Sequence, residues 1–229
     1  MEKEFVTDCG GIQPTDITEL VFILDKSGSM LGMEKDTIGG FNAMIEKQKA
    51  LDGKVYVSTV LFSNFSEVLH DRKSLEEIQP LTEKDYQVGG CTALLDAIGG
   101  AIKHIGNIHK YARKEDVPTR TLFVITTDGM ENASSEYHSK QIKDMIRTKE
   151  EKYGWEFLFL AANIDAVETA DSIGIRKERA VNYLVKEDTV EMFEEIGDTI
   201  RTFRTYDAMP MECATTIEKN IKKRKNKLK

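Results

Sequence analysis

Residues 19–30 read ELVFILDKSGSM, and this stretch decides the fold. Its first part, residues 20–24, is a continuous apolar run of the length and β-branched content typical of a strand buried on both faces of a parallel sheet. Polar residues follow at once, with Asp25, Ser27 and Ser29 in a D-x-S-x-S pattern. Because open α/β sheets bind their ligands beyond the C-terminal strand ends, these side chains lie where a site is expected.

The D-x-S-x-S turn has the composition of a cation site. A carboxylate and two hydroxyls at alternate positions of a tight turn can direct three oxygens at one point, and Gly28 relaxes the backbone between them. Oxygen ligands of this kind are what a hard divalent cation such as Mg²⁺ requires. The sequence therefore predicts a cation site directly after the first buried strand.

The rest of the chain alternates between strand and helix patterns. Besides the strand at 19–24, apolar runs predict strands at 54–62, 65–70, 121–127, 155–161 and 180–185. Spacings of three and four between apolar residues predict helices after Asp36, after Thr92, over 139–152, after Asp165 and around 193–203. Strands that alternate with crossover helices form a mostly parallel, doubly wound sheet with helices on both faces. The predicted fold class is therefore α/β.

Two further segments end at the same predicted edge of the sheet. Thr92 follows Gly89-Gly90 at the N-cap or first turn of its helix, and Asp128 directly follows the strand at 121–127. Taken alone, each has a purely structural explanation, because Thr commonly caps helices and Asp-Gly commonly forms turns. Together with the D-x-S-x-S pattern, they bring five oxygen-bearing side chains to one edge of the sheet.

On these residues the chain resembles the von Willebrand factor A domain family, whose metal-ion-dependent adhesion site combines D-x-S-x-S, a distant Thr and a distant Asp in this order. The likeness covers residues 19–205, and the stretches ILDKSGSM, GGCTALLDAIG and ITTDGMEN resemble those of stand-alone intracellular bacterial members. The resemblance implies a Rossmann-like, six-stranded sheet with one antiparallel edge strand. It also implies a ligand set for Mg²⁺, with Mn²⁺ or Ca²⁺ as alternatives, made of Asp25, Ser27, Ser29, Thr92 and Asp128.

The charge of this predicted site favours the binding of a partner. With only Asp25 and Asp128 as carboxylates, a divalent cation is not over-neutralised and keeps affinity for another anion. We therefore expect a protein-interaction module without catalytic activity, in which a Glu or Asp of a partner protein completes the metal coordination.

A metal-dependent hydrolase or phosphatase is the competing hypothesis. Enzymes with an aspartate nucleophile carry a second Asp two residues later, where this chain has Ser27. No G-x-x-x-x-G-K-[ST], G-x-G-x-x-G or G-x-S-x-G pattern is present. His104 and His109 match no metal or catalytic spacing, and Asn163 and Asp165 are predicted as turn and helix-cap residues at another strand end.

The chain of 229 residues suits one domain at 19–205, with an N-terminal arm at 1–18 and a disordered basic tail at 206–229. The net charge of −7 hides an asymmetry, because residues 219–229 hold seven basic and no acidic side chains. The remaining 218 residues hold 25 basic and 39 acidic side chains, a net of −14. Since an acidic body disfavours nucleic acid, only residues 219–229 are a candidate nucleic-acid contact.

The sequence predicts a cytoplasmic protein without a membrane span. No apolar run approaches the roughly 20 residues that a span requires, and no basic segment leads into an apolar one at the N-terminus. Cys9, Cys91 and Cys213 are widely spaced and form no C-x-x-C pair, which argues against a disulfide framework or a zinc site.

Overall fold

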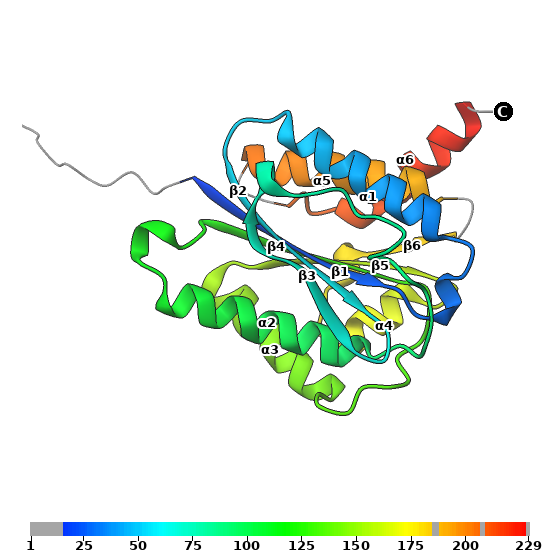
Figure 1. Cartoon of the computed structure of the whole chain (residues 1–229), viewed down its shortest axis with the longest axis horizontal. Helices are drawn as coiled ribbons and strands as arrows, with labels where there is room; N and C mark the ends of the chain where they lie inside the picture. The colour runs from blue at the N-terminus through cyan, green and yellow to red at the C-terminus, as the bar shows by residue number, and fades with distance from the viewer. Residues whose placement is uncertain (1–15, 185–187, 207–208, 228–229) are drawn as a thin grey trace, which may run out of the picture.

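The structure, a computed structural model, describes residues 16–184, 188–206 and 209–227. Six strands form one sheet in the order β3-β2-β1-β4-β5-β6 (Figure 1). The strands are β1 (Ile17–Asp25), β2 (Lys54–Phe62), β3 (Ser66–Ser74), β4 (Arg120–Thr127), β5 (Glu156–Ala162) and β6 (Ala180–Tyr183). Every neighbouring pair is parallel except β2 and β3, so the predicted mostly parallel sheet with one antiparallel edge strand is confirmed.

Six α-helices cover the two faces of the sheet. They are α1 (Glu34–Lys49), α2 (Leu94–Tyr111), α3 (Ser139–Tyr153), α4 (Ala166–Ser172), α5 (Thr189–Tyr206) and α6 (Cys213–Lys227). Helices α1, α5 and α6 share one hydrophobic cluster with the sheet, and α2, α3 and α4 share the other (Figure 1). None of the helices in the described part of the chain combines the length and apolar composition needed to cross a membrane.

Strand β1 lies in the middle of the sheet and is buried on both faces. Leu20, Phe22 and Leu24 join the cluster beneath α1 and α5, whereas Val21 and Ile23 join the cluster beneath α2. All five side chains are fully buried, as the continuous apolar run predicts. The strand also begins two residues earlier than predicted, so the end of the predicted arm belongs to the sheet, while residues 1–15 lie outside the described residues.

The C-terminal segment differs from the disordered tail expected over 206–229. Helix α5 reaches Tyr206, and α6 follows with Cys213, Ala214, Ile217 and Ile221 buried against the core. These positions form one apolar stripe of helical spacing, which stabilises the helix through packing. The many lysines of this segment hide the stripe in the sequence.

Candidate metal centre

The strand order reverses at β1, since β2 and β3 lie on one side of it and β4, β5 and β6 on the other. The C-terminal ends of β1 and β4 therefore flank the crevice in which open α/β sheets bind ligands. Asp25 is the last residue of β1, and Asp128 directly follows the last residue of β4. The two predicted carboxylates thus face the same crevice from neighbouring strands.

The carboxylate of Asp25 is buried and held from two sides. Its Oδ1 accepts a hydrogen bond from the backbone N–H of Ser27 at 2.7 Å, and its Oδ2 accepts one from the hydroxyl of Thr127 at 2.6 Å. The hydroxyl of Tyr86 donates a hydrogen bond to the backbone carbonyl of Asp25. Because Thr127 belongs to β4, these bonds fix the first loop against the neighbouring strand.

A chain of short contacts links the remaining predicted residues. The hydroxyl oxygens of Ser27 and Ser29 lie 3.0 Å apart, and Ser29 Oγ donates to Asp128 Oδ1 at 2.5 Å. A Cβ atom at Gly129 would lie 3.1 Å from Ser29 Oγ and 3.3 Å from Thr92 Oγ1, so these two hydroxyls border the same space. The structure therefore brings all five predicted residues together, and their role as metal ligands stays a prediction.

Glycines join the loop before Thr92 to the first loop. The N–H of Gly28 donates to the carbonyl of Gly90 at 3.0 Å, and the N–H of Gly89 donates to the carbonyl of Lys26 at 2.9 Å. Gly90 has φ +83°, a left-handed conformation that glycine adopts without strain. The backbone of this loop is thus fixed beside the D-x-S-x-S turn, which positions Thr92.

Thr92 is not the N-cap of α2. The N-cap is Ala93, whose side chain cannot accept a hydrogen bond, so the first turn depends on partners from elsewhere. These partners come from the loop after Asp128: Asn132 Oδ1 accepts the N–H of Thr92 at 2.9 Å, and Glu131 Oε2 accepts the N–H of Leu95 at 3.0 Å.

Sequence reasoning missed these supporting residues, because it looks for a helix cap next to the helix it caps. Glu131 lies 36 residues after Leu95, and Asn132 lies 40 residues after Thr92. The one available signal was the polar stretch E-N directly after Asp128-Gly129-Met130, where no helix starts. The loop after β4 thereby supports both Asp128 and the segment that carries Thr92.

The electrostatics of the site leave its negative charge uncompensated. Burial raises the pKa of Asp25, and hydrogen bonds from Thr127 and Ser27 oppose that change. Burial also raises the pKa of Asp128, where the Ser29 hydrogen bond opposes the change and the charge of Asp25 adds to it. The second oxygen of Asp128, Oδ2, is buried and has no hydrogen-bond partner within the described residues.

These residues fit a hard divalent cation. Two carboxylates and three hydroxyls provide only oxygen ligands, which Mg²⁺ prefers, and Asp128 Oδ2, unpartnered among the described residues, is an acceptor that a cation would satisfy. No group of three or more His, Cys, Asp and Glu side chains that could hold a metal occurs in the described part of the chain. The fit therefore depends on the serine and threonine hydroxyls.

Other candidates from the sequence lie apart from this cluster. Asp165 caps α4, accepting hydrogen bonds from the N–H groups of the second and third residues after it, as predicted. Asn163 has φ +57°, consistent with the predicted turn after β5. His104 bonds Asp71, and the ring of His109 bonds the buried Glu19.

No protein-family model matches the sequence, and no curated protein does. Solved structures do match. The ArnB paralog VWA2 from Sulfolobus acidocaldarius is 19% identical with a TM-score of 0.51, over 81% of this chain and 45% of that chain. The vWF domain of the type V pili tip protein Mfa5 from Porphyromonas gingivalis is 11% identical with a TM-score of 0.58, over 84% of this chain and 98% of that domain. The conserved hypothetical protein BatB from Bacteroides thetaiotaomicron is 14% identical with a TM-score of 0.51, over 81% of this chain and 98% of that chain.

This chain has the fold of a von Willebrand factor A (VWA) domain. The chain spans less than half the length of the Sulfolobus protein and nearly all of the Mfa5 domain and BatB. The expectation from the sequence is therefore confirmed at the level of the fold. The VWA fold places the five predicted residues at the C-terminal edge of the sheet, on three loops fixed to one another by hydrogen bonds.

Proposed function

We propose that this VWA domain is a metal-dependent protein-interaction module. Its ligands for Mg²⁺, or for Mn²⁺, are Asp25, Ser27, Ser29, Thr92 and Asp128, and it captures a Glu or Asp side chain of a partner protein. One observation carries the proposal: hydroxyl and carboxylate oxygens from three loops meet at the switch point of the sheet, beside a buried carboxylate oxygen that has no hydrogen-bond partner among the described residues.

The proposed ligands are of two kinds, charged carboxylates and neutral hydroxyls. Asp25 and Asp128 supply the negative charge, whereas the hydroxyls add oxygens without adding charge. The hydrogen bond from Thr127 holds Asp25 in place. When bound, Mg²⁺ would offer a coordination position to a further anionic oxygen. The two site carboxylates balance the charge of a divalent cation without exceeding it, so the site repels a further anionic oxygen less than a more acidic site would.

Exposed apolar side chains beside the site support a protein as the partner. Leu31 follows Ser29 by two residues and is 70% exposed, and Met130 follows Asp128 by two residues and is 72% exposed. Large apolar side chains next to a polar centre are typical of protein-binding surfaces, where they are buried by the partner. A partner carboxylate flanked by apolar residues fits this arrangement.

We propose that the site performs no catalysis. Enzymes with an aspartate nucleophile carry a second Asp two residues later, and this chain has Ser27 at that position. The histidines bond elsewhere, to Thr59, Asp71 and Glu19 and within the capping box of α3. Magnesium-dependent turnover of a phosphoester that disappears in Asp25→Ala would instead support the hydrolase hypothesis.

We also propose the cytoplasm as the compartment of this protein. Cys91 and Cys213 are free cysteines, exposed and buried respectively, as expected in a reducing environment. The nucleic-acid hypothesis for residues 219–229 remains secondary, because Arg224 in that segment pairs with Glu194, Glu195 and Asp198 of α5.

A pull-down from a cell lysate, in Mg²⁺ and in EDTA, tests the proposal. Wild type should retain a partner only in Mg²⁺, and Asp25→Ala should not retain it in either buffer. Asp36→Ala is the matched control, because Asp36 is an exposed carboxylate in the first turn of α1 and outside the cluster. Leu31→Asp should lower capture while preserving metal binding. Capture that survives both EDTA and Asp25→Ala would contradict the proposal.

A further inference from the structure

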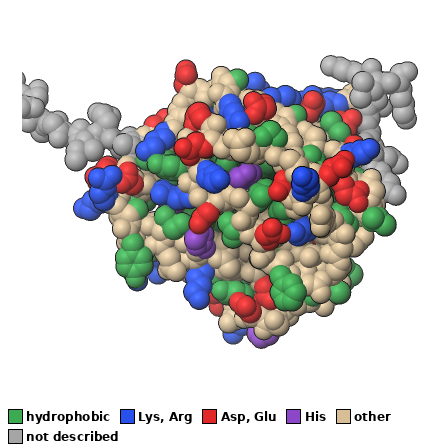
Figure 2. Space-filling view, viewed as in Figure 1, with side chains coloured by type: hydrophobic (Ala, Val, Ile, Leu, Met, Phe, Trp, Pro, Cys, Tyr) green, Lys and Arg blue, Asp and Glu red, His purple; other side chains and the backbone are tan. Residues whose placement is uncertain are grey.

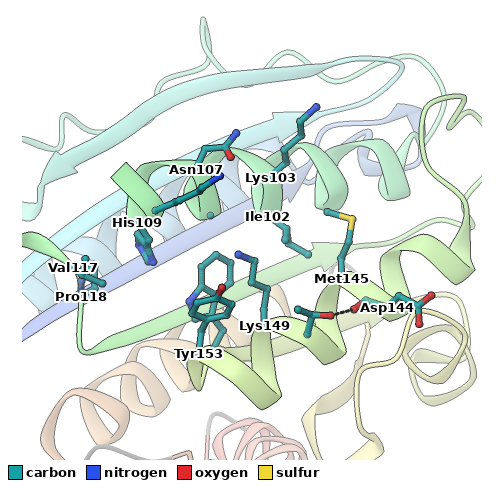
Figure 3. Close-up of a pocket in the computed structure, with 14 residues that line it drawn as sticks. Ile102, Lys103, Asn107, His109, Val117, Pro118, Asp144, Met145, Lys149 and Tyr153 are labelled. Atoms are coloured by element: carbon teal, nitrogen blue, oxygen red, sulfur yellow. Dashed lines mark hydrogen bonds between the residues drawn. The ribbon is translucent and has the colours of Figure 1, made fainter. Parts of the chain in front are cut away.

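A cavity lies between α2 and α3, lined by residues 102–110 of α2 and residues 144–153 of α3 (Figure 3). Its volume is about 580 Å³, which is within the range of small-molecule sites. Thr92 lies just before the N-terminal end of α2, so the cavity and the candidate metal centre belong to opposite ends of this helix. Trp155, Ile102 and Met145 give the cavity apolar walls.

The ammonium group of Lys149 is the unusual feature of this cavity. Its Nζ lies 4.4 Å from the ring centroid of Trp155 and 4.7 Å from that of Tyr153. It forms no hydrogen bond or ion pair with any residue that the structure describes. Burial lowers the pKa of Lys149, and no carboxylate counteracts this change. Figure 3 shows Lys149 beside Tyr153, both extending from α3 toward α2.

Gly106 provides the space that this ammonium group occupies. A Cβ atom at position 106 would lie 2.5 Å from Lys149 Nζ and 3.3 Å from its Cε. A glycine inside a helix costs about 1 kcal/mol relative to alanine. Here it gives the amine room against the backbone of α2.

The lining of the cavity is positive in a protein that is negative overall. Three lysines, Lys103, Lys110 and Lys149, face one aspartate, Asp144, which itself lies 3.3 Å from Arg147. The chain as a whole has a net charge of −7, and acidic and basic side chains are interspersed on the face shown in Figure 2. Compensation of the α3 dipole does not account for Lys149, because the basic residue of the last turn is Lys152.

We propose that this cavity binds a small organic anion, with an aromatic or other apolar body that carries a sulfonate, carboxylate or phosphate group. The body packs against Trp155 and Ile102, and the anionic group pairs with Lys149. Lys103 and Lys110 add positive charge at the mouth of the cavity. This inference is independent of metal binding and of the proposed partner.

The probe for the test is 8-anilinonaphthalene-1-sulfonate, an aromatic sulfonate that fluoresces when bound in apolar surroundings. Trp155, the only tryptophan of the chain, lines this cavity, so its emission should fall as the probe binds, and the variants of the lining link that signal to the cavity. Titration of the full chain in EDTA should show saturable binding. Lys149→Met should weaken that binding about tenfold, the loss of one charge-assisted contact. Lys152→Met, on the same helix and outside the lining, should bind as wild type does.

Two further ligands, an uncharged aromatic probe and inorganic phosphate, separate the contribution of the apolar body to affinity from that of the anionic group. The uncharged N-phenyl-1-naphthylamine should bind wild type more weakly than the sulfonate does, and this difference should be about tenfold smaller in Lys149→Met. Inorganic phosphate should displace the probe only at much higher concentration, because it lacks an apolar body. Asp25→Ala should bind the probe normally, which separates this inference from the metal site.

Three results would overturn the inference: no saturable binding to wild type, equal affinity of wild type and Lys149→Met, or displacement by phosphate as readily as by an aromatic sulfonate. Near-ultraviolet circular dichroism of each variant confirms that its fold is intact. If Lys149→Met failed this control, Lys103→Met, at an exposed position of the same lining, should still weaken binding severalfold.

Discussion

The two ends of α2 carry opposite and uncompensated charge. Before its N-terminal end, the buried carboxylates of Asp25 and Asp128 lie close enough to repel each other, and one oxygen of Asp128 has no hydrogen-bond partner among the described residues. Along its C-terminal half, the half-buried ammonium of Lys149 lies against aromatic rings without a described carboxylate. Other partly buried charges are paired within the chain, as Arg179 is with Glu156.

The contrast between unpaired charges at the two ends of α2 and paired charges such as Arg179 and Glu156 indicates where external ligands are expected. Buried charges are stabilised only when they are paired, so a charge that the chain leaves without a partner at a cleft is a candidate for an external one. The first end has the ligand set of a divalent cation, and the second has the lining of an anion site. The predictions below test whether the two ends are chemically independent.

The largest effect is expected for Asp128→Asn. Loss of a charged ligand should lower Mg²⁺ affinity by about 100-fold or more, measured by calorimetric titration. In EDTA the same variant should be more stable than wild type, measured as a higher Tm. The sign follows from the raised pKa of Asp128: above that pKa the ionised carboxylate destabilises the folded state, and asparagine removes the charge.

Asp36→Asn is the control for this variant and should change neither quantity. Binding of the aromatic sulfonate in the cavity between α2 and α3 should be unchanged in both variants. If Asp128→Asn bound Mg²⁺ as wild type does, the assignment of Asp128 as a metal ligand before the N-terminal end of α2 would be wrong.

A smaller effect is expected for Glu131→Ala. This change removes the acceptor for the N–H of Leu95, which should lower the free energy of unfolding by about 1 kcal/mol, as for a lost helix cap. Because the same loop positions the segment of Thr92, Mg²⁺ affinity should fall about tenfold. Thermal unfolding and calorimetric titration measure the two effects.

The exposed Glu136, whose side chain forms no hydrogen bond or ion pair among the described residues, provides the matched control Glu136→Ala. A loss of stability with unchanged Mg²⁺ affinity would show that the loop stabilises α2 without positioning the site.

The smallest effect is expected for Gly106→Ala at the other end of α2. The added methyl group would displace the ammonium of Lys149 while leaving its charge in place, so the aromatic sulfonate should bind a fewfold more weakly. Alanine should also stabilise the helix by up to about 1 kcal/mol. Gly100→Ala is the control, because nothing lies within 4 Å of a Cβ atom there. Equal probe affinity in the two variants would refute the role assigned to Gly106.

The fold and the five clustered residues could be predicted because each depends on local patterns. The apolar run before Asp25 identifies a buried strand, and strand ends in a parallel sheet meet at one edge. The convergence of Thr92 and Asp128 on the D-x-S-x-S turn follows from chain order alone once the sheet is doubly wound. Their contacts in the structure agree with that reasoning.

Features that depend on packing between distant segments could not be predicted. Gly106 and Lys149 meet only because α2 and α3 pack side by side, and nothing in either helix specifies the other. The same holds for Glu131, which caps a helix that begins far earlier in the chain. Helix α6 was missed for a different reason: its lysines dominate the composition, whereas the stripe that includes Ile217 and Ile221 determines its structure.

Calorimetric titration of Mg²⁺ into wild type and Asp25→Ala tests the central claim most directly. The account predicts saturable binding to wild type and none to Asp25→Ala, with the same circular dichroism spectrum for both proteins. Equal binding by the two proteins, or no binding of Mg²⁺ or Mn²⁺ by wild type, would contradict the assignment of the metal centre. An Asp25→Ala variant that failed to fold would show that this residue serves the fold rather than a function.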